Sequence, residues 1–164
     1  MNADDPSDLK RLAVDIVPFE PEHAAGFAAL VGDTLREFGF EPDAELDRDL
    51  EDPAGTYAAL WIALAEGAVA GSVALRDLGG DAYELKRMYL RSACRGSGVG
   101  KRLLVTALEW ARANHARVVR LDTTERMIAA RHLYESAGFV QAPGEGPPRQ
   151  GQQRLLYELR VRTP

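Results

Sequence analysis

Residues 94 to 101 form the stretch with the most recognisable chemistry. They read Cys-Arg-Gly-Ser-Gly-Val-Gly-Lys, which places glycines at alternate positions between an arginine and a lysine. Glycine lets the main chain curl tightly and expose its N–H groups. Such donors at the start of a helix create a site of positive potential that suits a phosphate or pyrophosphate. The stretch therefore predicts an anion-binding loop.

The charges around this loop favour the same interpretation. Every charged residue from Lys86 to Arg102 is basic, although the chain as a whole carries a net charge of −5. A basic segment on an acidic protein indicates a local site for a small anionic ligand. It does not indicate a nucleic-acid-binding surface, which is typically basic over a whole domain.

The glycine spacing differs from two common nucleotide-binding motifs. A P-loop has serine or threonine directly after its lysine, and Arg102 stands in that position. A dinucleotide-binding loop has the pattern G-x-G-x-x-G, whereas the third glycine here, Gly100, comes one position early. Asp122 lies near the place of a ribose-binding acid, so a Rossmann-like dinucleotide binder stays open as an alternative.

The loop and its flanks resemble the GCN5-related N-acetyltransferase (GNAT) family. The pyrophosphate loop of that family has the pattern R-x-x-G-x-G, which is present here from Arg95 to Gly100. The segments 84–90 before the loop and 133–139 after it look like further signatures of the family at the family's spacing. The resemblance is specific over residues 83–139 and only topological outside them.

This resemblance implies an α/β fold with a single GNAT-like domain. The sheet would be mixed and mostly antiparallel, with helices on both faces and a V-shaped split between the fourth and fifth strands. Acetyl-coenzyme A (acetyl-CoA) would lie in that split, its pyrophosphate on the loop and its pantetheine along residues 88–90, where a main-chain N–H would face the thioester oxygen. By position, the implied cofactor-binding residues are Met88, Tyr89, Leu90, Arg95, Gly96, Ser97, Gly98, Val99, Gly100, Lys101 and Arg102.

The same carry-over gives two catalytic candidates. An amine arrives as ammonium and must lose a proton before it attacks, and a proton donor stabilises the leaving thiolate. Glu84 is the expected base, acting in a partly buried setting or through a water; its structural alternatives are a surface strand carboxylate or a salt bridge to Arg87. Tyr134, in the context Leu-Tyr-Glu-x-x-Gly-Phe, is the expected acid; its structural alternative is a place in the core.

Two positions depart from the family's pattern. Met127 stands where many members have an asparagine that bonds the pantetheine, and Ser92 stands where a proline often follows the fourth strand. The change at Met127 leaves an acyl-CoA-binding module without turnover as a second interpretation. Cys94 is not expected to be a nucleophile, because no histidine lies at a spacing that would activate it.

Hydrophobic periodicity predicts the elements that must position these residues. Strands are predicted at 12–17, 57–64, 69–75, 83–90, 117–123 and 155–161, and helices at 21–38, 99–114 and 130–137. The stretch 143–153, rich in proline, glycine and glutamine, is predicted to be a loop. The segment 41–52 holds seven acids against one arginine and is predicted to be a solvated surface helix; the alternative is that its acids attract a cationic amine.

One strand carries a sign of irregularity. Tyr83 and Leu85 share one phase of the period-two pattern, whereas Met88 and Leu90 share the other. A strand that buries both pairs on one face needs an extra residue near Lys86 or Arg87, which is a β-bulge. The alternative is a strand buried on both faces.

Length and composition limit the number of domains and the class of protein. A chain of 164 residues that is 46% hydrophobic can form one domain with a substantial core, so we expect a disordered tail at 1–10 and a GNAT-like domain at 11–164. The longest apolar run, 58–65, is far shorter than the roughly 18 residues of a membrane helix. With no signal-peptide pattern, the expected location is cytoplasmic. One cysteine and three histidines predict neither an internal disulfide nor a metal site.

The expected function is therefore that of an N-acetyltransferase. It would move an acetyl group from acetyl-CoA to a primary amine by direct attack in a ternary complex. The acceptor would be an amine-bearing small molecule, peptide or protein, with no nucleic acid, membrane or metal involved. Whether the chain forms a homodimer stays open.

Overall fold

A computed structural model describes residues 13–161 of the chain; the tail expected at residues 1–10 lies outside the described residues. In chain order the elements are β1 (Val14–Pro18), the 3₁₀ turn η1 (Pro21–His23), α2 (Ala24–Glu37), η2 (Arg48–Leu50), α3 (Pro53–Thr56), β2 (Ala59–Ala65), β3 (Ala68–Gly79), β4 (Ala82–Leu90), η3 (Ser92–Cys94), α4 (Val99–Ala113), β5 (Val118–Thr124), α5 (Ile128–Ser136), β6 (Val140–Arg149) and β7 (Gln152–Arg160).

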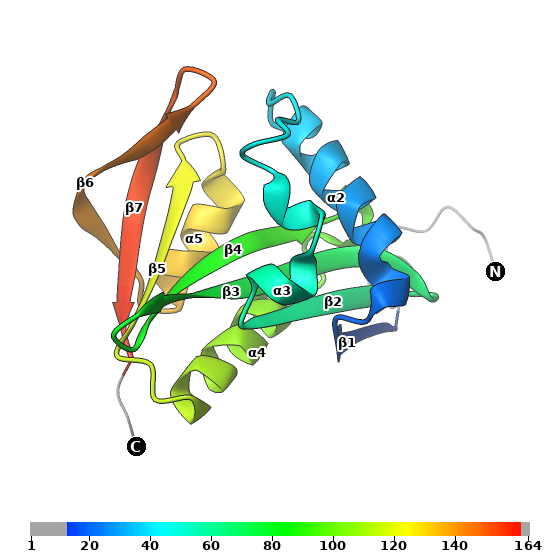
Figure 1. Cartoon of the computed structure of the whole chain (residues 1–164), viewed down its shortest axis with the longest axis horizontal. Helices are drawn as coiled ribbons and strands as arrows, with labels where there is room; N and C mark the ends of the chain where they lie inside the picture. The colour runs from blue at the N-terminus through cyan, green and yellow to red at the C-terminus, as the bar shows by residue number, and fades with distance from the viewer. Residues whose placement is uncertain (1–12, 162–164) are drawn as a thin grey trace.

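The described strands form one sheet in the order β1-β2-β3-β4-β5-β7-β6. All neighbours are antiparallel except β4 and β5, which run parallel. Helices α2 and α3 cover one face of the sheet, and α4 and α5 cover the other (Figure 1). The mixed, mostly antiparallel sheet with helices on both faces confirms the predicted fold class.

Two hydrophobic cores lie on the two faces of the sheet. The apolar face of α4 packs against β2, β3, β4 and β5 on one side, and the apolar face of α2 packs against the same sheet on the other. The buried residues of α4 are the ones whose spacing predicts the helix: Val99, Leu103, Leu104, Ala107, Leu108 and Ala111. This burial fixes the helix whose first turn follows the glycine loop.

The predicted hairpin is present as β2 and β3. Glu66 and Gly67 form its turn, with φ angles of 51° and 78°. Two consecutive positive φ angles are typical of the tight turns that match the twist of a hairpin.

The bulge in β4 lies where the change of phase predicts it. Ser72 of β3 pairs with Tyr89, whereas Ala74, two residues further on, pairs with Lys86, so β4 has one residue more than β3 in this interval. Arg87 has a φ of 52°, which marks it as the irregular residue. After the bulge, Met88 packs on the α4 side of the sheet, as Leu85 does before it.

Strands β4 and β5 separate soon after they meet. They pair only from Ala82 with Val118 to Glu84 with Arg120. Each strand then continues, and β7 accompanies β5 along its whole length. The separation is the expected V-shaped split, with Glu84 at its vertex (Figure 1).

The loop predicted at residues 143–153 is wrong, because most of that stretch belongs to β6 and β7. Strand β6 lies at the edge of the sheet and pairs with β7 in a register that shifts twice, between Gln141 and Glu145 and between Gly146 and Arg149. An edge strand tolerates proline, because one side of its backbone needs no partner. A composition typical of loops therefore also suits an interrupted edge strand.

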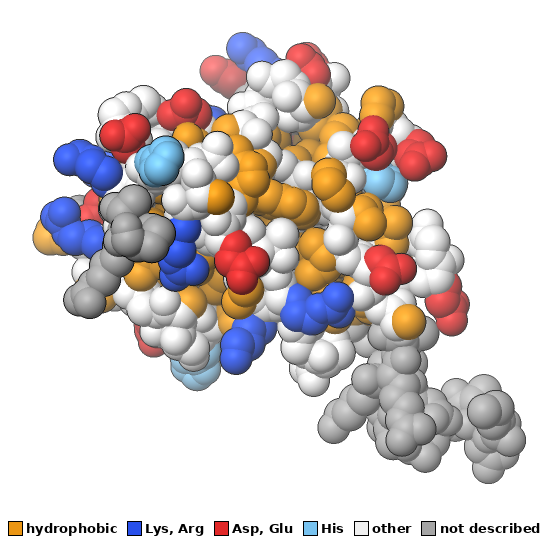
Figure 2. All heavy atoms as spheres, turned by 90° about the horizontal axis from the view of Figure 1, so that it is seen from below, with side chains coloured by type: hydrophobic (Ala, Val, Ile, Leu, Met, Phe, Trp, Pro, Cys, Tyr) orange, Lys and Arg blue, Asp and Glu red, His pale blue; other side chains and the backbone are white. Residues whose placement is uncertain are grey.

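The face seen from below the view of Figure 1 has hydrophobic side chains gathered across its middle, with charged side chains distributed around them (Figure 2). Two large apolar side chains on the helices of the α4 side of the sheet are exposed: Val105 of α4 and Ile128 of α5. Within the part of the chain that the structure describes, no helix combines the length and the apolar character that a membrane crossing requires.

Candidate active site

An open groove runs between the end of β4, the glycine loop (residues 95–101) and α5. It has a volume of about 540 Å³ and is lined mainly by apolar and small residues. Eight of the predicted cofactor-binding residues line it: Met88, Tyr89, Leu90, Arg95, Gly96, Gly98, Gly100 and Lys101. The structure thus brings the end of the bulged strand and the glycine loop to one surface.

The glycine loop has the conformation that an anion site requires. Gly96 and Gly98 have φ angles of 74° and 85°, in the region that favours glycine, and a Cβ built on either meets no atom within 4 Å. Gly98 is the N-cap of α4, so the N–H groups of the first helical turn have no acceptor within the helix. These donors, open space and the positive end of the helix dipole fit a bound pyrophosphate.

Three predicted cofactor residues do not line the groove. Ser97 donates its hydroxyl to the carbonyl of Cys94, and Val99 is buried in the core. Arg102 donates to the main-chain oxygen of Val14 at 2.9 Å, so its guanidinium is directed to β1. Ser97 and Val99 contribute main chain to the loop, whereas Arg102 is turned away from it.

Arg95 lines the groove but is already bound to α2. Its guanidinium makes a bidentate ion pair with Glu37, lies over the ring of Phe38 at 5.7 Å, and donates from Nε to the oxygen of Leu90 at 3.0 Å. The hydrogen bond from Arg95 lowers the pKa of Glu37 below its ordinary value. Arg95 therefore ties the loop to α2.

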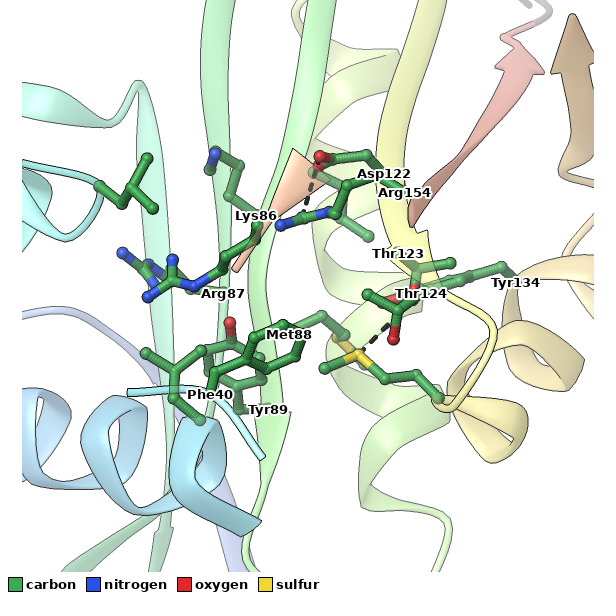
Figure 3. A pocket seen from close by; sticks show the side chains of 15 residues that line it. Phe40, Lys86, Arg87, Met88, Tyr89, Asp122, Thr123, Thr124, Tyr134 and Arg154 are labelled. Atoms are coloured by element: carbon green, nitrogen blue, oxygen red, sulfur yellow. Dashed lines mark hydrogen bonds and ion pairs between the residues drawn. The ribbon is translucent and has the colours of Figure 1, made fainter. Parts of the chain in front are cut away.

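A second, narrower cavity opens between β4 and β5, where Figure 3 shows the labelled side chains of the two strands on opposite sides of it. Its lining residues are Leu35, Phe40, Leu46, Leu85, Lys86, Arg87, Met88, Tyr89, Asp122, Thr123, Thr124, Met127, Tyr134, Arg149 and Arg154. Met88, Tyr89 and Met127 line both the groove and this cavity. The two spaces therefore meet at the bulged end of β4.

The side chain of Met127 is held at this junction by a hydrogen bond to its sulfur. Thr123 donates its hydroxyl to the sulfur of Met127 at 3.5 Å, across the start of α5. The thioether thus presents an apolar surface where the family's asparagine would present an amide.

Tyr134 lines the second cavity from α5. Its side chain is buried and packs against Phe139, whose N–H donates to the Tyr134 carbonyl at 3.0 Å and closes the C-terminus of the helix. Burial, followed by the charges of Tyr89 and Asp122, raises the pKa of Tyr134 well above its ordinary value. The phenol is therefore protonated at neutral pH, as it would be at its ordinary pKa.

Glu84 lines neither space. Its carboxylate lies 2.8 Å from Arg76 and 3.5 Å from Lys86, so Glu84 is ion-paired. The expected salt bridge to Arg87 is wrong, because Arg87 pairs with Asp47 and Asp49. Oε1 is buried, and the approach of Arg76 does not have hydrogen-bond geometry. The next two residues of the strand, Leu85 and Lys86, do line the second cavity.

The cationic wall of the second cavity is the part of the site that sequence reasoning missed. Arg87 on β4 and Arg149 on β6 are both buried, and both bind Asp47. Arg154 on β7 binds Asp122 at 2.9 Å. Arg149 and Arg154 lie in or beside the stretch predicted as a loop, so only a correct strand assignment could have placed them.

The acidic segment is also different from its prediction. Asp47 is buried and Asp49 is half-buried, and Arg87 donates to Asp49 at 2.8 and 2.6 Å and to Asp47 at 3.0 Å. Burial alone would raise the pKa of Asp49, but hydrogen bonds from Arg87 and Tyr57 and the arginine charge outweigh it, so that pKa is lowered. The prediction of a solvated surface is wrong for these two acids, and their charges are already paired.

Comparison with known proteins agrees with the geometry. A model of the acetyltransferase (GNAT) family matches residues 24–139. The chain is 34% identical over 131 residues to N-acetylaspartate synthetase of Danio rerio, covering 72% of this chain and 46% of that protein. It is 30% identical over 141 residues to an uncharacterised N-acetyltransferase of Schizosaccharomyces pombe, covering 82% and 84%. The chain spans less than half the length of the N-acetylaspartate synthetases it matches.

Solved structures show the same fold. A GNAT-family acetyltransferase from Staphylococcus aureus Mu50 superposes with a TM-score of 0.83 at 21% identity, covering 92% of this chain and 100% of that one. The yncA acetyltransferase of Salmonella typhimurium, determined with its cofactor acetyl-CoA, superposes with a TM-score of 0.72 at 15% identity, covering 92% and 95%. Because the family model covers most of the chain and the fold agrees, this protein belongs to the acetyltransferase (GNAT) family.

Proposed function

We propose that this protein is an N-acetyltransferase that moves the acetyl group of acetyl-CoA to a primary amine while both substrates are bound. The junction of the two spaces at Met88, Tyr89 and Met127 carries the proposal. A groove that starts at a phosphate-binding loop and a separate cavity that meets it at one point suit two ligands that react at their ends. Direct transfer needs such proximity and orientation.

The glycine loop is proposed to hold the pyrophosphate through main-chain N–H groups of residues 96–101, with Lys101 adding charge. Beyond Glu84, the side of β4 that faces the split has no strand partner, because β5 has moved away. The free main-chain groups of residues 88–90 would pair with the pantetheine amides, and one N–H would stabilise charge on the thioester oxygen.

Bound acetyl-CoA supplies a thioester carbonyl whose C–S bond breaks as the amine nitrogen bonds to the acetyl carbon. Tyr134 is proposed to donate a proton to the departing sulfur, since its side chain lines the cavity that meets the groove and its phenol is protonated at neutral pH. Glu84, at the vertex of the split, is proposed to take the ammonium proton through a water, because its carboxylate contacts Lys86 of the cavity wall but does not itself line the cavity.

The test measures thiol release from acetyl-CoA with a panel of primary amines, with the products identified by mass. The panel includes L-aspartate, because the Danio rerio relative is named for N-acetylaspartate. We expect amine-dependent thiol release and intersecting double-reciprocal plots, which a ternary complex produces. Binding of acetyl-CoA without thiol release for any amine would favour a binding module, and binding of NAD in its place would favour a dinucleotide site.

A further inference from the structure

The walls of the second cavity point to the chemical class of the acceptor, an inference that rests on the proposed function. Four cationic side chains line this cavity, and Asp122 is the carboxylate among its lining residues. The four cations are Lys86, Arg87, Arg149 and Arg154. Lys86 and Arg87 lie on β4, Arg149 on β6 and Arg154 on β7, so the fold brings them together from distant parts of the sequence.

Nearby carboxylates neutralise these charges only in part. Asp47 and Asp49 bind Arg87, Asp47 is shared with Arg149, and Asp122 binds Arg154. Four cations therefore face three carboxylates. Lys86 and Arg76 in turn share Glu84, which leaves the local excess of positive charge unchanged. A ligand with negative charge would complete this arrangement, and a further cation would be repelled by it.

Three residues that line the cavity also carry a buried polar atom without a hydrogen-bond partner. Over residues 13–161, five buried side-chain atoms lack a hydrogen-bond partner, and three of these belong to cavity residues: Nε of Arg149, Nε of Arg154 and Oγ1 of Thr124. A guanidinium can only donate, so the missing partner of each arginine is an acceptor. Arg149 is 7% exposed, and a native protein rarely leaves buried polar groups unpaired unless water or a ligand completes them.

The size and polarity of the cavity limit what can enter. Its volume is about 80 Å³, which leaves room for several waters or for a compact ligand. A lysine side chain of a protein substrate would place four apolar methylenes beside the arginines and add a positive charge. In Figure 3, the Asp122–Arg154 pair lies at one end of the cavity and Met88 with Tyr89 at the other. An acceptor can therefore keep its amine at the junction with the groove while an anionic group reaches Arg154.

We propose that the acceptor is a small amine that also carries carboxylates, such as an acidic amino acid, and that Arg149 and Arg154 bind the carboxylates. Charge-assisted hydrogen bonds from a guanidinium to a carboxylate are stronger than neutral ones, and the planar fork of arginine suits that group. Asp122 is then a positioning residue, because it holds Arg154 from the side of β5.

The first experiment compares amines of different charge. Thiol release from acetyl-CoA is measured with L-aspartate, with its two monoamides and with spermidine. We expect kcat/KM for L-aspartate to exceed that for each monoamide by about tenfold or more, the size of effect expected for one charge-assisted hydrogen bond. Equal rates for aspartate and its amides, or a preference for spermidine, would overturn the proposal.

The second experiment needs no turnover. Succinate, which has two carboxylates and no amine, is titrated by calorimetry in the presence of coenzyme A, with succinamide as the neutral counterpart. We expect heat of binding for succinate alone. If succinate binds but no amine is acetylated, the anion site stands and the proposed function fails; if amines are acetylated without regard to carboxylates and succinate does not bind, the function stands and the anion site fails.

Variants of Arg154 test whether the preference for carboxylates arises in the second cavity. Arg154→Gln should raise the KM for L-aspartate about tenfold or more and abolish succinate binding, while the KM for acetyl-CoA stays unchanged; Arg154→Lys should restore part of the affinity. The matched control is Arg120→Gln, which removes an exposed arginine that pairs with Glu158 at 2.7 Å outside the cavity. Equal loss in Arg154→Gln and Arg120→Gln, or a parent-like KM in a folded Arg154→Gln, would contradict the proposal.

Discussion

The hydroxyl of Ser72 on β3 donates a 2.6 Å hydrogen bond to the main-chain oxygen of Arg87, the residue at which β4 bulges. A bulge leaves main-chain groups outside the regular ladder. Because Ser72 is fully buried, no solvent could take its place at this carbonyl. The bond therefore fixes the irregularity that turns the end of β4 toward the groove.

Replacing Ser72 by alanine should loosen this bulge. Ser72→Ala leaves the buried Arg87 carbonyl without its partner, so we expect the free energy of unfolding to fall by about 1–3 kcal/mol. Since the bulge places residues 88–90 against the groove, kcat/KM should fall roughly tenfold as well, as small misplacements do in active sites. Urea unfolding and initial rates with acetyl-CoA check both effects.

Thr106→Ala is the matched control for this change. The Thr106 hydroxyl also donates to a main-chain carbonyl, that of Arg102 at 2.8 Å, but on the exposed side of α4. Its loss should change the free energy of unfolding by less than about 0.5 kcal/mol and leave kcat/KM unchanged. Similar losses of unfolding free energy in the two variants would mean that the buried Ser72 hydrogen bond stabilises the fold no more than the exposed Thr106 bond does.

Gly100 offers a direct test of the loop, because its replacement leaves the folded chain unstrained. A Cβ at Gly100 would lie 3.5 Å from Cδ2 of Leu133, an ordinary contact, yet it would stand in the wall of the groove. We expect Gly100→Ala to weaken coenzyme A binding about tenfold or more, equal to about 1.4 kcal/mol, with unfolding free energy unchanged or higher. Calorimetric titration with coenzyme A measures the affinity.

The control for Gly100 is another helical glycine. Gly32 lies in α2, and its added Cβ would approach only the flexible end of Arg36. Gly32→Ala should gain up to about 1 kcal/mol in helix stability without a change in coenzyme A affinity. If Gly100→Ala binds coenzyme A as tightly as Gly32→Ala does, the pyrophosphate does not sit on this loop.

Local patterns in the sequence predict two elements that border the groove, the bulged end of β4 and the start of α4. The change of phase between Leu85 and Met88 predicts the bulge, because side chains of a strand alternate strictly. Gly98 with the apolar face that follows it predicts the start of α4. Each of these features depends on residues close together in the chain.

Pairings across the fold account for what the sequence did not predict. Arg149 meets Asp47 across 102 positions, and Arg95 meets Glu37 across 58. No local pattern specifies such partners, so the sequence alone predicts solvated acids at residues 41–52 and gives no sign that Arg95 pairs with Glu37. The edge strand β6 was missed for a related reason, because its proline content fits a loop until its pairing with β7 is known.

Tyr134→Phe should separate proton donation from binding. Removal of the hydroxyl should lower kcat roughly 10- to 100-fold while the KM for acetyl-CoA changes little, because the ring and its packing on Phe139 remain. Tyr83→Phe is the control, since Tyr83 packs edge-on against Trp110 and lines neither cavity. A Tyr134→Phe enzyme as fast as Tyr83→Phe would return Tyr134 to a purely structural role.

The raised pKa of Tyr134 also predicts a stability change at alkaline pH. The folded protein keeps the phenolic proton above pH 10, where the unfolded chain loses it, so the free energy of unfolding should fall as the pH rises beyond about 10. Tyr134→Phe should reduce this slope, whereas it should not alter the pH dependence between about 6 and 9. Urea unfolding midpoints measured across both pH ranges test whether stability falls, as expected, and not rises above about pH 10.

Glu84→Gln tests the proposed base through the pH profile. If Glu84 accepts the ammonium proton, the variant should lose roughly 100-fold in kcat/KM near pH 7 and approach the parent at higher pH, where free amine no longer needs a base. Glu158→Gln is the control, because this carboxylate pairs with Arg120 outside both cavities. A ratio of Glu84→Gln to parent that stays constant across the range would leave Glu84 as an ion-pair partner of Arg76. In that case Asp122, the carboxylate that does line the cavity beside Tyr134, becomes the base to test, with Asp122→Asn measured over the same range.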